Sequence, residues 1–219
     1  MKVLKDNGLT IVLLLATFAT VIGMMFTGHS VYNEELSTHG SSPIALFAYL
    51  ATGHFLSALF ENWESEFLQM SAYVVLTAYL FQRGSAESKD PDEVSPQDAD
   101  PADEEGNPNA PLAVRMGGVS RNLYSYSLGL VLLGLFIASF VMHLRESAAA
   151  EAAEASLHGR AAPTTLDHIF SAQMWFESFQ NWQSEFLSTA ILIFLSIFLR
   201  FRGSPESKPV SAPHSETGA

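Results

Sequence analysis

The chain has 219 residues, no cysteine, 48 % hydrophobic residues and a formal net charge of −12. The absence of cysteine excludes disulfides, thiolate metal sites and cysteine nucleophiles. The acidic balance, with no basic patch beyond a few arginines at helix ends, gives no support to nucleic-acid binding.

Four apolar segments follow one another along the chain, and the first and third are long enough to cross a bilayer. Residues 9–27 carry no charged side chain, and residues 123–144 carry none apart from the titratable His143. About 20 apolar residues cross the roughly 30 Å hydrocarbon core. Residues 67–82 and 186–199 reach that length only if the Asn-Trp-x-Ser-Glu segment before each one enters the membrane. We therefore predict an all-α membrane protein with four transmembrane helices.

The segment between the second and third helices is strongly acidic. Nine of the 23 acidic residues lie between Glu87 and Glu105, among many Pro and Ser residues. Such a composition buries too little apolar surface to offset the entropy of ordering the chain. We predict a disordered linker over residues 84–118 and a disordered tail over residues 204–219.

The two halves of the chain are copies of one unit. A shift of 119 residues aligns Phe60–Leu68 with Phe179–Leu187, where seven of nine residues are identical and the other two are Glu/Gln exchanges. The same shift aligns Arg-Gly-Ser-x-Glu-Ser-Lys at 83–89 with its copy at 202–208. The match extends into the first apolar segment, so we expect that segment to be a membrane helix of the unit rather than a cleaved signal peptide.

The repeats, residues 1–83 and 119–203, are expected to be parallel. Each holds two membrane helices, an even number, so both copies enter the membrane from the same side and are related by a pseudo-twofold axis along the membrane normal. Lys and Arg concentrate near the termini and the linker, whereas the opposite segments carry only Arg145 and Arg160. By the positive-inside rule, both termini and the linker are predicted to be cytoplasmic.

The duplicated Phe-x-Asn-Trp-x-Ser-Glu-Phe-Leu block, followed by a helix and Arg-Gly-Ser-x-Glu-Ser-Lys, resembles an uncharacterised family of bacterial integral membrane proteins. The resemblance covers most of the chain outside the linker. It implies a location in the bacterial inner membrane. That family brings no established activity, so no catalytic residue is transferred from it.

The helices that carry the block have a polar face where they enter the membrane. Glu66 precedes Arg83 by 17 positions, roughly 25 Å along a helix, and Glu185 stands in the same relation to Arg202. Ionisable residues at that depth indicate function. We hypothesise that the two glutamates face each other across the pseudo-twofold axis and bind a cation or share a proton. The duplicated polar residues that complete this predicted site are Asn62, Asn181, Ser65 and Ser184.

A structural interpretation of the same residues remains open. The Asn, Ser and Glu side chains would then form hydrogen bonds between helices or to the outer loops. Trp63 and Trp182 would anchor the helices at the membrane interface.

The outer segments are expected to include amphipathic helices that begin near Pro43 and Pro163. Just before them, each copy places a glutamate four residues ahead of a histidine: Glu35 with His39, and Glu154 with His158. Residues spaced in this way share a helix face, and together they offer ligands for a divalent metal. The competing interpretation is a helix end, because glycine follows each histidine and a cationic histidine favours a helix C-terminus.

Three classes of function follow from these observations. The first is a membrane module that binds or passes a small ion or solute at Glu66 and Glu185. The second is a non-catalytic accessory or scaffold protein, and the third is a metalloenzyme that uses the outer His and Glu residues. No nucleophile elbow, phosphate-binding glycine loop or HExxH signature supports the third. The expected partners are the lipid bilayer and a second copy or another membrane protein, and no cofactor is expected beyond a divalent metal in the third class.

Overall fold

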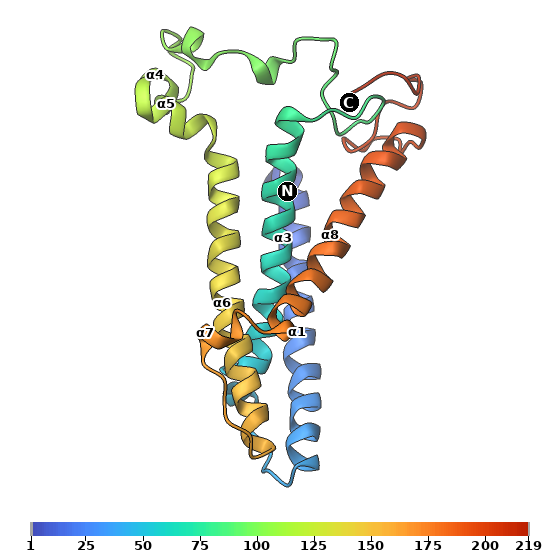
Figure 1. The fold of residues 1–219 in the computed structure, drawn as a ribbon. Helices are drawn as coiled ribbons and strands as arrows, with labels where there is room; N and C mark the ends of the chain where they lie inside the picture. Colours follow the sequence, from blue (N-terminus) through green and yellow to red (C-terminus); the bar gives the residue numbers. More distant parts are fainter. Residues whose placement is uncertain (1, 219) are drawn as a thin grey trace. The chain divides into compact units, whose positions relative to one another are not determined.

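The structure is a computed structural model that describes residues 2–218, and within that range it contains helices and loops but no strand. The long helices, shown in Figure 1, are α1 (Lys2–Thr38), α3 (Gly53–Tyr79), α6 (Ser127–Leu157) and α8 (Ala172–Phe198). The short ones are α2 (Leu46–Tyr49), the 3₁₀ turns η1 (Pro96–Asp98) and η2 (Pro101–Glu104), α4 (Leu112–Arg115), α5 (Gly118–Ser125) and α7 (Thr165–His168). The all-α prediction is confirmed for the described residues.

Two helices, α1 and α6, are long and apolar enough to cross a membrane. Large apolar side chains are exposed along both, such as Leu13 and Phe18 on α1 and Val131 on α6. A continuous apolar surface of this kind suits lipid better than water. The third apolar segment predicted from the sequence is interrupted at Tyr126, where α5 ends and α6 begins.

The helices α3 and α8 have 27 residues each, which corresponds to roughly 40 Å of helix. Both are long, but glutamates interrupt their apolar composition. Glu61, Glu64 and Glu66 fall in the first half of α3, and Glu177 and Glu185 fall in α8. Length and composition therefore identify two of the four predicted spans.

The outer segments are shorter than the amphipathic helices expected from Pro43 and Pro163, because α2 and α7 are single turns. In the first segment the chain before α2 is not helical, and the Asn33 side chain binds its backbone. Its Oδ1 accepts from the backbone nitrogen of Ile44 at 2.8 Å, and its Nδ2 donates to the carbonyl of the same residue at 3.1 Å.

The chain divides into two compact units. The first unit comprises Met1–Phe60 and Val141–Trp175, and the second comprises Glu61–Phe140 and Phe176–Ala219. Each unit combines residues from both halves of the sequence, so contacts between the halves occur within each of them.

Candidate functional site

Within the second unit, polar side chains of α3 and α8 form hydrogen bonds to one another, and we call this contact the α3–α8 seam. The three bonds run from Asn181 Nδ2 to Glu61 Oε1, from Trp182 Nε1 to Glu64 Oε1 at 2.7 Å, and from Gln69 Nε2 to Thr189 Oγ1 at 2.6 Å. Two of these bonds join residues of the duplicated block, and the third lies just after it.

The two glutamates of the predicted site come from the same two helices, α3 and α8. Glu66 is exposed and Glu185 is half-buried, and the negative charge of Glu66 acts on Glu185. The paired site at Glu66 and Glu185 stays a prediction.

The smaller residues of the predicted site are engaged elsewhere. Ser65 donates its hydroxyl to the Asn62 carbonyl at 2.9 Å, and Ser184 donates to the Asn181 carbonyl at 2.8 Å, so each serine bonds within its own helix. The side chain of Asn181 is bonded to Glu61. The structure therefore supports the structural interpretation for these residues more directly than a role beside the glutamates.

Glu64 is the seam residue that sequence reasoning missed. Its side chain is fully buried, and a buried carboxylate needs a partner, which the Trp182 indole supplies. Glu64 is not among the duplicated polar residues of the predicted site, and nothing in its local sequence distinguishes it from a surface glutamate. Trp182 thus donates to a buried glutamate, and interfacial anchoring stays a prediction both for Trp182 and for Trp63, which is 40 % exposed.

Beyond α3 and α8, both copies of the Arg-Gly-Ser-x-Glu-Ser-Lys motif form the same loop. The backbone nitrogens of Gln82 and Phe201 donate to the hydroxyls of Ser88 and Ser207, each at 2.9 Å. A glycine with positive φ turns each loop, at 85° for Gly84 and 89° for Gly203, a conformation that suits glycine best. The backbone around the motif glutamate therefore has the same turn in both copies, at Glu87 and at Glu206.

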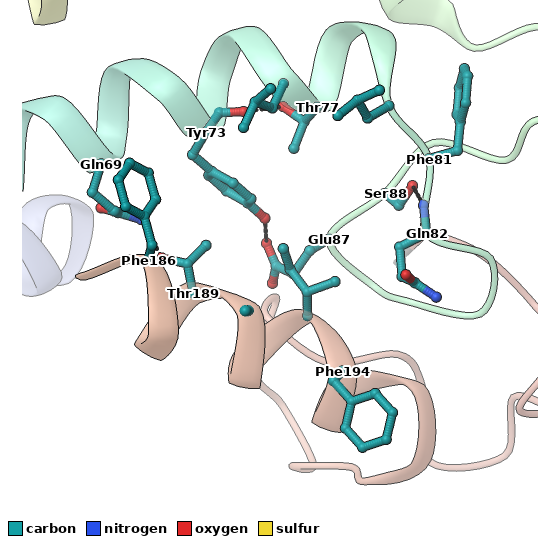
Figure 2. Close-up of a pocket in the computed structure, with 14 residues that line it drawn as sticks. Gln69, Tyr73, Thr77, Phe81, Gln82, Glu87, Ser88, Phe186, Thr189 and Phe194 are labelled. Atoms are coloured by element: carbon teal, nitrogen blue, oxygen red, sulfur yellow. Dashed lines mark hydrogen bonds between the residues drawn. The ribbon is translucent and has the colours of Figure 1, made fainter. Parts of the chain in front are cut away.

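The carboxyls of these two glutamates, Glu87 and Glu206, are close enough to interact. Tyr73 Oη donates to Glu87 Oε2 at 2.8 Å, and Figure 2 shows the tyrosine of α3 pointing toward this carboxyl. The Glu206 carboxyl, from the loop after α8, acts on the same group. Burial raises the pKa of Glu87, the Tyr73 hydrogen bond lowers it, and the Glu206 carboxyl raises it again, with a net increase. Glu87 is therefore harder to ionise than an exposed glutamate.

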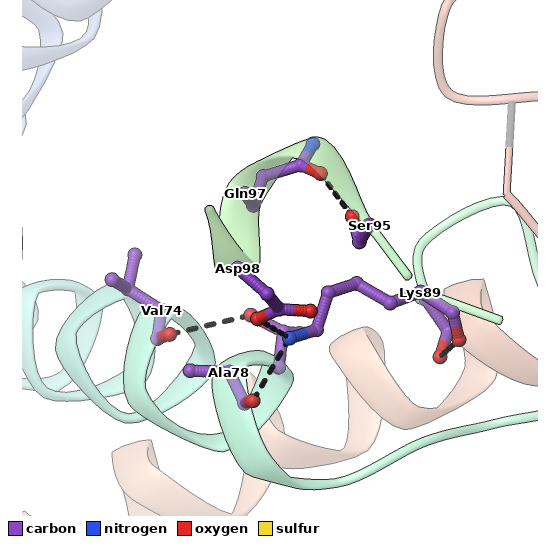
Figure 3. A network of polar contacts seen from close by, with 8 residues as sticks. Val74, Ala78, Lys89, Ser95, Gln97 and Asp98 are labelled. Carbon is purple, nitrogen blue, oxygen red and sulfur yellow. Dashed lines mark hydrogen bonds and ion pairs between the residues drawn. The ribbon is translucent and has the colours of Figure 1, made fainter. Parts of the chain in front are cut away.

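The lysines that end each motif hold chain segments in place. Lys89 Nζ donates to the Ala78 carbonyl at 3.1 Å and pairs with Asp98 at 2.5 Å (Figure 3). Lys208 is buried, and its ammonium donates to the carbonyls of Pro213, His214 and Glu216 at 3.2, 3.0 and 2.7 Å. The disorder expected for residues 84–118 and 204–219 remains a prediction.

The first unit contains a separate polar cluster around His168, a residue outside the sites predicted from the sequence. His168 Nε2 lies 2.9 Å from Ser147 Oγ, and its Nδ1 lies 2.7 Å from a Glu151 carboxylate oxygen. The order serine, histidine, carboxylate invites comparison with a hydrolase triad. However, Ser147 is only 3 % exposed and lies within α6, where backbone N–H groups are used by the helix. We therefore interpret the cluster as a buried packing contact.

The outer histidines end their helices as the cap interpretation predicts. His39 Nδ1 and His158 Nδ1 each lie 3.0 Å from the backbone oxygen four residues earlier, on Glu35 and Glu154. The glycines that follow have φ of 72° and 65°. Each helix then closes with a hydrogen bond over five residues, from Ser41 to Leu36 and from Arg160 to Ala155, both at 2.8 Å, the pattern of a Schellman motif.

The structure also brings the two outer histidines together, with ring centroids 4.9 Å apart. The Glu154 carboxylate is paired with Arg160 at 3.3 Å. Over residues 2–218, no group of three or more His, Asp or Glu side chains is placed to hold a metal ion. The metal hypothesis for Glu35, His39, Glu154 and His158 stays a prediction.

Comparison with known proteins adds a family but no activity. No curated protein and no solved structure matches the chain. A match to the family described as a domain of unknown function (DUF6766) covers residues 1–219, the whole chain. The long apolar helices, the α3–α8 seam and the paired loop glutamates described above are therefore features of a protein that belongs to the DUF6766 family.

Proposed function

We propose that this is a multi-pass membrane protein that binds or passes a small ion or solute at Glu66 and Glu185. In this proposal α1, α3, α6 and α8 all cross the membrane as two parallel two-helix repeats. Both termini and the linker face the cytoplasm, and the membrane is the bacterial inner membrane that the resemblance of the duplicated block implies. The length and apolar composition of α1 and α6 support the membrane location.

One observation carries the choice of ion binding over the alternatives. The carboxyls of Glu66 and Glu185 come from equivalent positions of the two copies, and the charge of one acts on the other. Two carboxylates held in this way are stabilised by a shared proton or by a bound cation. The seam supplies the polar contacts that keep α3 and α8 together around them.

The double variant Glu66→Gln/Glu185→Gln is expected to abolish ion flux while leaving the protein folded, because glutamine keeps the size and hydrogen bonding of glutamate but not its charge. Flux is measured as dye-reported proton or alkali-cation uptake into proteoliposomes, and it should fall to the level of protein-free liposomes. The control Glu93→Gln/Glu104→Gln removes the same charge from the linker and should retain wild-type flux.

Wild-type flux in a folded Glu66→Gln/Glu185→Gln protein would remove the ion proposal. The accessory function would then be favoured, and it predicts a membrane-protein partner that co-purifies with the chain. The metalloenzyme alternative predicts a stoichiometric metal that is lost when His39 and His158 are replaced.

A further inference from the structure

We propose that the cavity between the C-terminal halves of α3 and α8 binds an organic cation, with the Glu87–Glu206 carboxyl pair as its counter-charge. The cavity has a volume of about 420 Å³, within the range of roughly 300–1,000 Å³ that is typical of small-molecule sites. It lies wholly in the second unit. The inference goes beyond the proposed function, because it concerns different residues and a different class of ligand.

The walls of the cavity are mainly apolar and partly aromatic. Phe81, Phe186 and Phe194 line it together with the Tyr73 ring, and Figure 2 shows Phe186 and Phe194 extending from α8 and Tyr73 from α3. Aromatic faces attract cations through their quadrupole, and more strongly when the cation is desolvated. These walls suit a ligand with an apolar body and a positive charge.

The negative charge at the cavity favours a positively charged ligand. Glu87 is the one charged side chain among the described residues that line the cavity, and its partner Glu206 is also acidic. An apolar cavity with a carboxylate at its edge favours a cation and disfavours an anion of the same shape.

The position of Glu87 is held by its neighbours. Tyr73 from α3 donates to it at 2.8 Å, and the Glu206 carboxyl from the loop after α8 acts on it. Tyr73 and Glu206 are the titratable groups that act on this carboxyl. A cation that enters pairs with the ionised Glu87 carboxylate, so it competes with the proton for this group.

The pH dependence has a definite direction. The pKa of Glu87 is raised, so its protonated form persists to a higher pH than that of an exposed glutamate. Protons compete with the cation for Glu87, and affinity should therefore rise with pH until this carboxyl is fully ionised.

The test uses two probes of nearly the same shape on the purified full-length protein. Benzyltrimethylammonium carries the charge, and neopentylbenzene replaces its nitrogen by carbon and is neutral. We expect calorimetry to show binding of the ammonium probe, tighter at higher pH, with proton release that falls as Glu87 becomes ionised. Glu87→Gln should weaken binding at least about tenfold and remove the proton release, and Glu206→Gln should weaken binding because it removes the second negative charge.

The control Glu93→Gln changes an exposed carboxylate of the same loop that does not line the cavity, and it should bind as the wild type does. Equal affinity for the two probes, or unchanged affinity in a folded Glu87→Gln protein, would overturn the inference. The Glu66→Gln/Glu185→Gln protein should still bind the ammonium probe, so failure of the proposed ion site and failure of this inference are separate results.

Discussion

Gly53→Ala is expected to destabilise the protein by about 1–3 kcal/mol or more, the usual range for a side chain forced into a packed contact. A β-carbon at this position would lie 2.5 Å from the backbone nitrogen of Ala150 and 2.5 Å from the carbonyl oxygen of Glu146. Both are backbone atoms of α6 and have no rotamer that moves them away. Relief therefore requires the start of α3 to move away from α6. Thermal unfolding of the detergent-purified protein measures the effect.

Two other glycines serve as matched controls. At Gly23 in α1 and Gly134 in α6, an added β-carbon would meet no atom within 4 Å. Alanine at either position should leave stability unchanged or raise it by up to about 1 kcal/mol, because it favours the helix more than glycine does. A Gly53→Ala protein as stable as Gly134→Ala would show that α3 does not approach α6 as closely as the structure has it.

His168→Tyr is expected to destabilise the protein by roughly 2–3 kcal/mol, and Ser147→Gly should restore part of the loss. The reason lies in the equivalent positions of the first copy, where Tyr49 stands for His168 and Gly28 for Ser147. A β-carbon at Gly28 would overlap the Tyr49 hydroxyl, so the tyrosine fits only because glycine faces it. The second copy instead fills the position with the smaller histidine, which bonds to the serine.

A double-mutant cycle on His168→Tyr and Ser147→Gly measures this coupling by chemical or thermal unfolding. Ser147→Gly alone should lower stability by about 1 kcal/mol, since glycine is unfavourable inside a helix. The two changes should nevertheless couple favourably, by about 1 kcal/mol or more. Additive effects would mean that the two sites do not pack in the way their first-copy equivalents do.

Several parts of the fold were predictable because they depend on local composition. The apolar runs predicted long helices, and α1 and α6 match them in length and character. The glycine after each outer histidine predicted the helix ends, since only a residue tolerant of positive φ closes a helix in that way. The exception was Tyr126, where the third apolar run is interrupted between α5 and α6, a local bend that composition does not reveal.

The candidate sites were only partly predictable, because each depends on residues distant in the chain. The duplication predicted that Glu66 and Glu185 occupy equivalent positions of the two copies, and their pairing stays a prediction. The buried Glu64–Trp182 bond was not predictable, because in the sequence Glu64 resembles an exposed glutamate and Trp182 resembles an interfacial residue. Glu64 is buried in the folded protein, and there the Trp182 indole donates a hydrogen bond to it.

The sequence by itself determined the helical class, the duplication, the acidic linker and the presence of glutamates in α3 and α8, because these are properties of residue type and spacing. Only the tertiary structure decided which side chains meet. It brought the Tyr73 hydroxyl and the Glu206 carboxyl to Glu87. It also placed His168 between Ser147 and Glu151. The physical reason is that hydrogen bonding and burial depend on the approach of separate helices and loops, which no local pattern encodes.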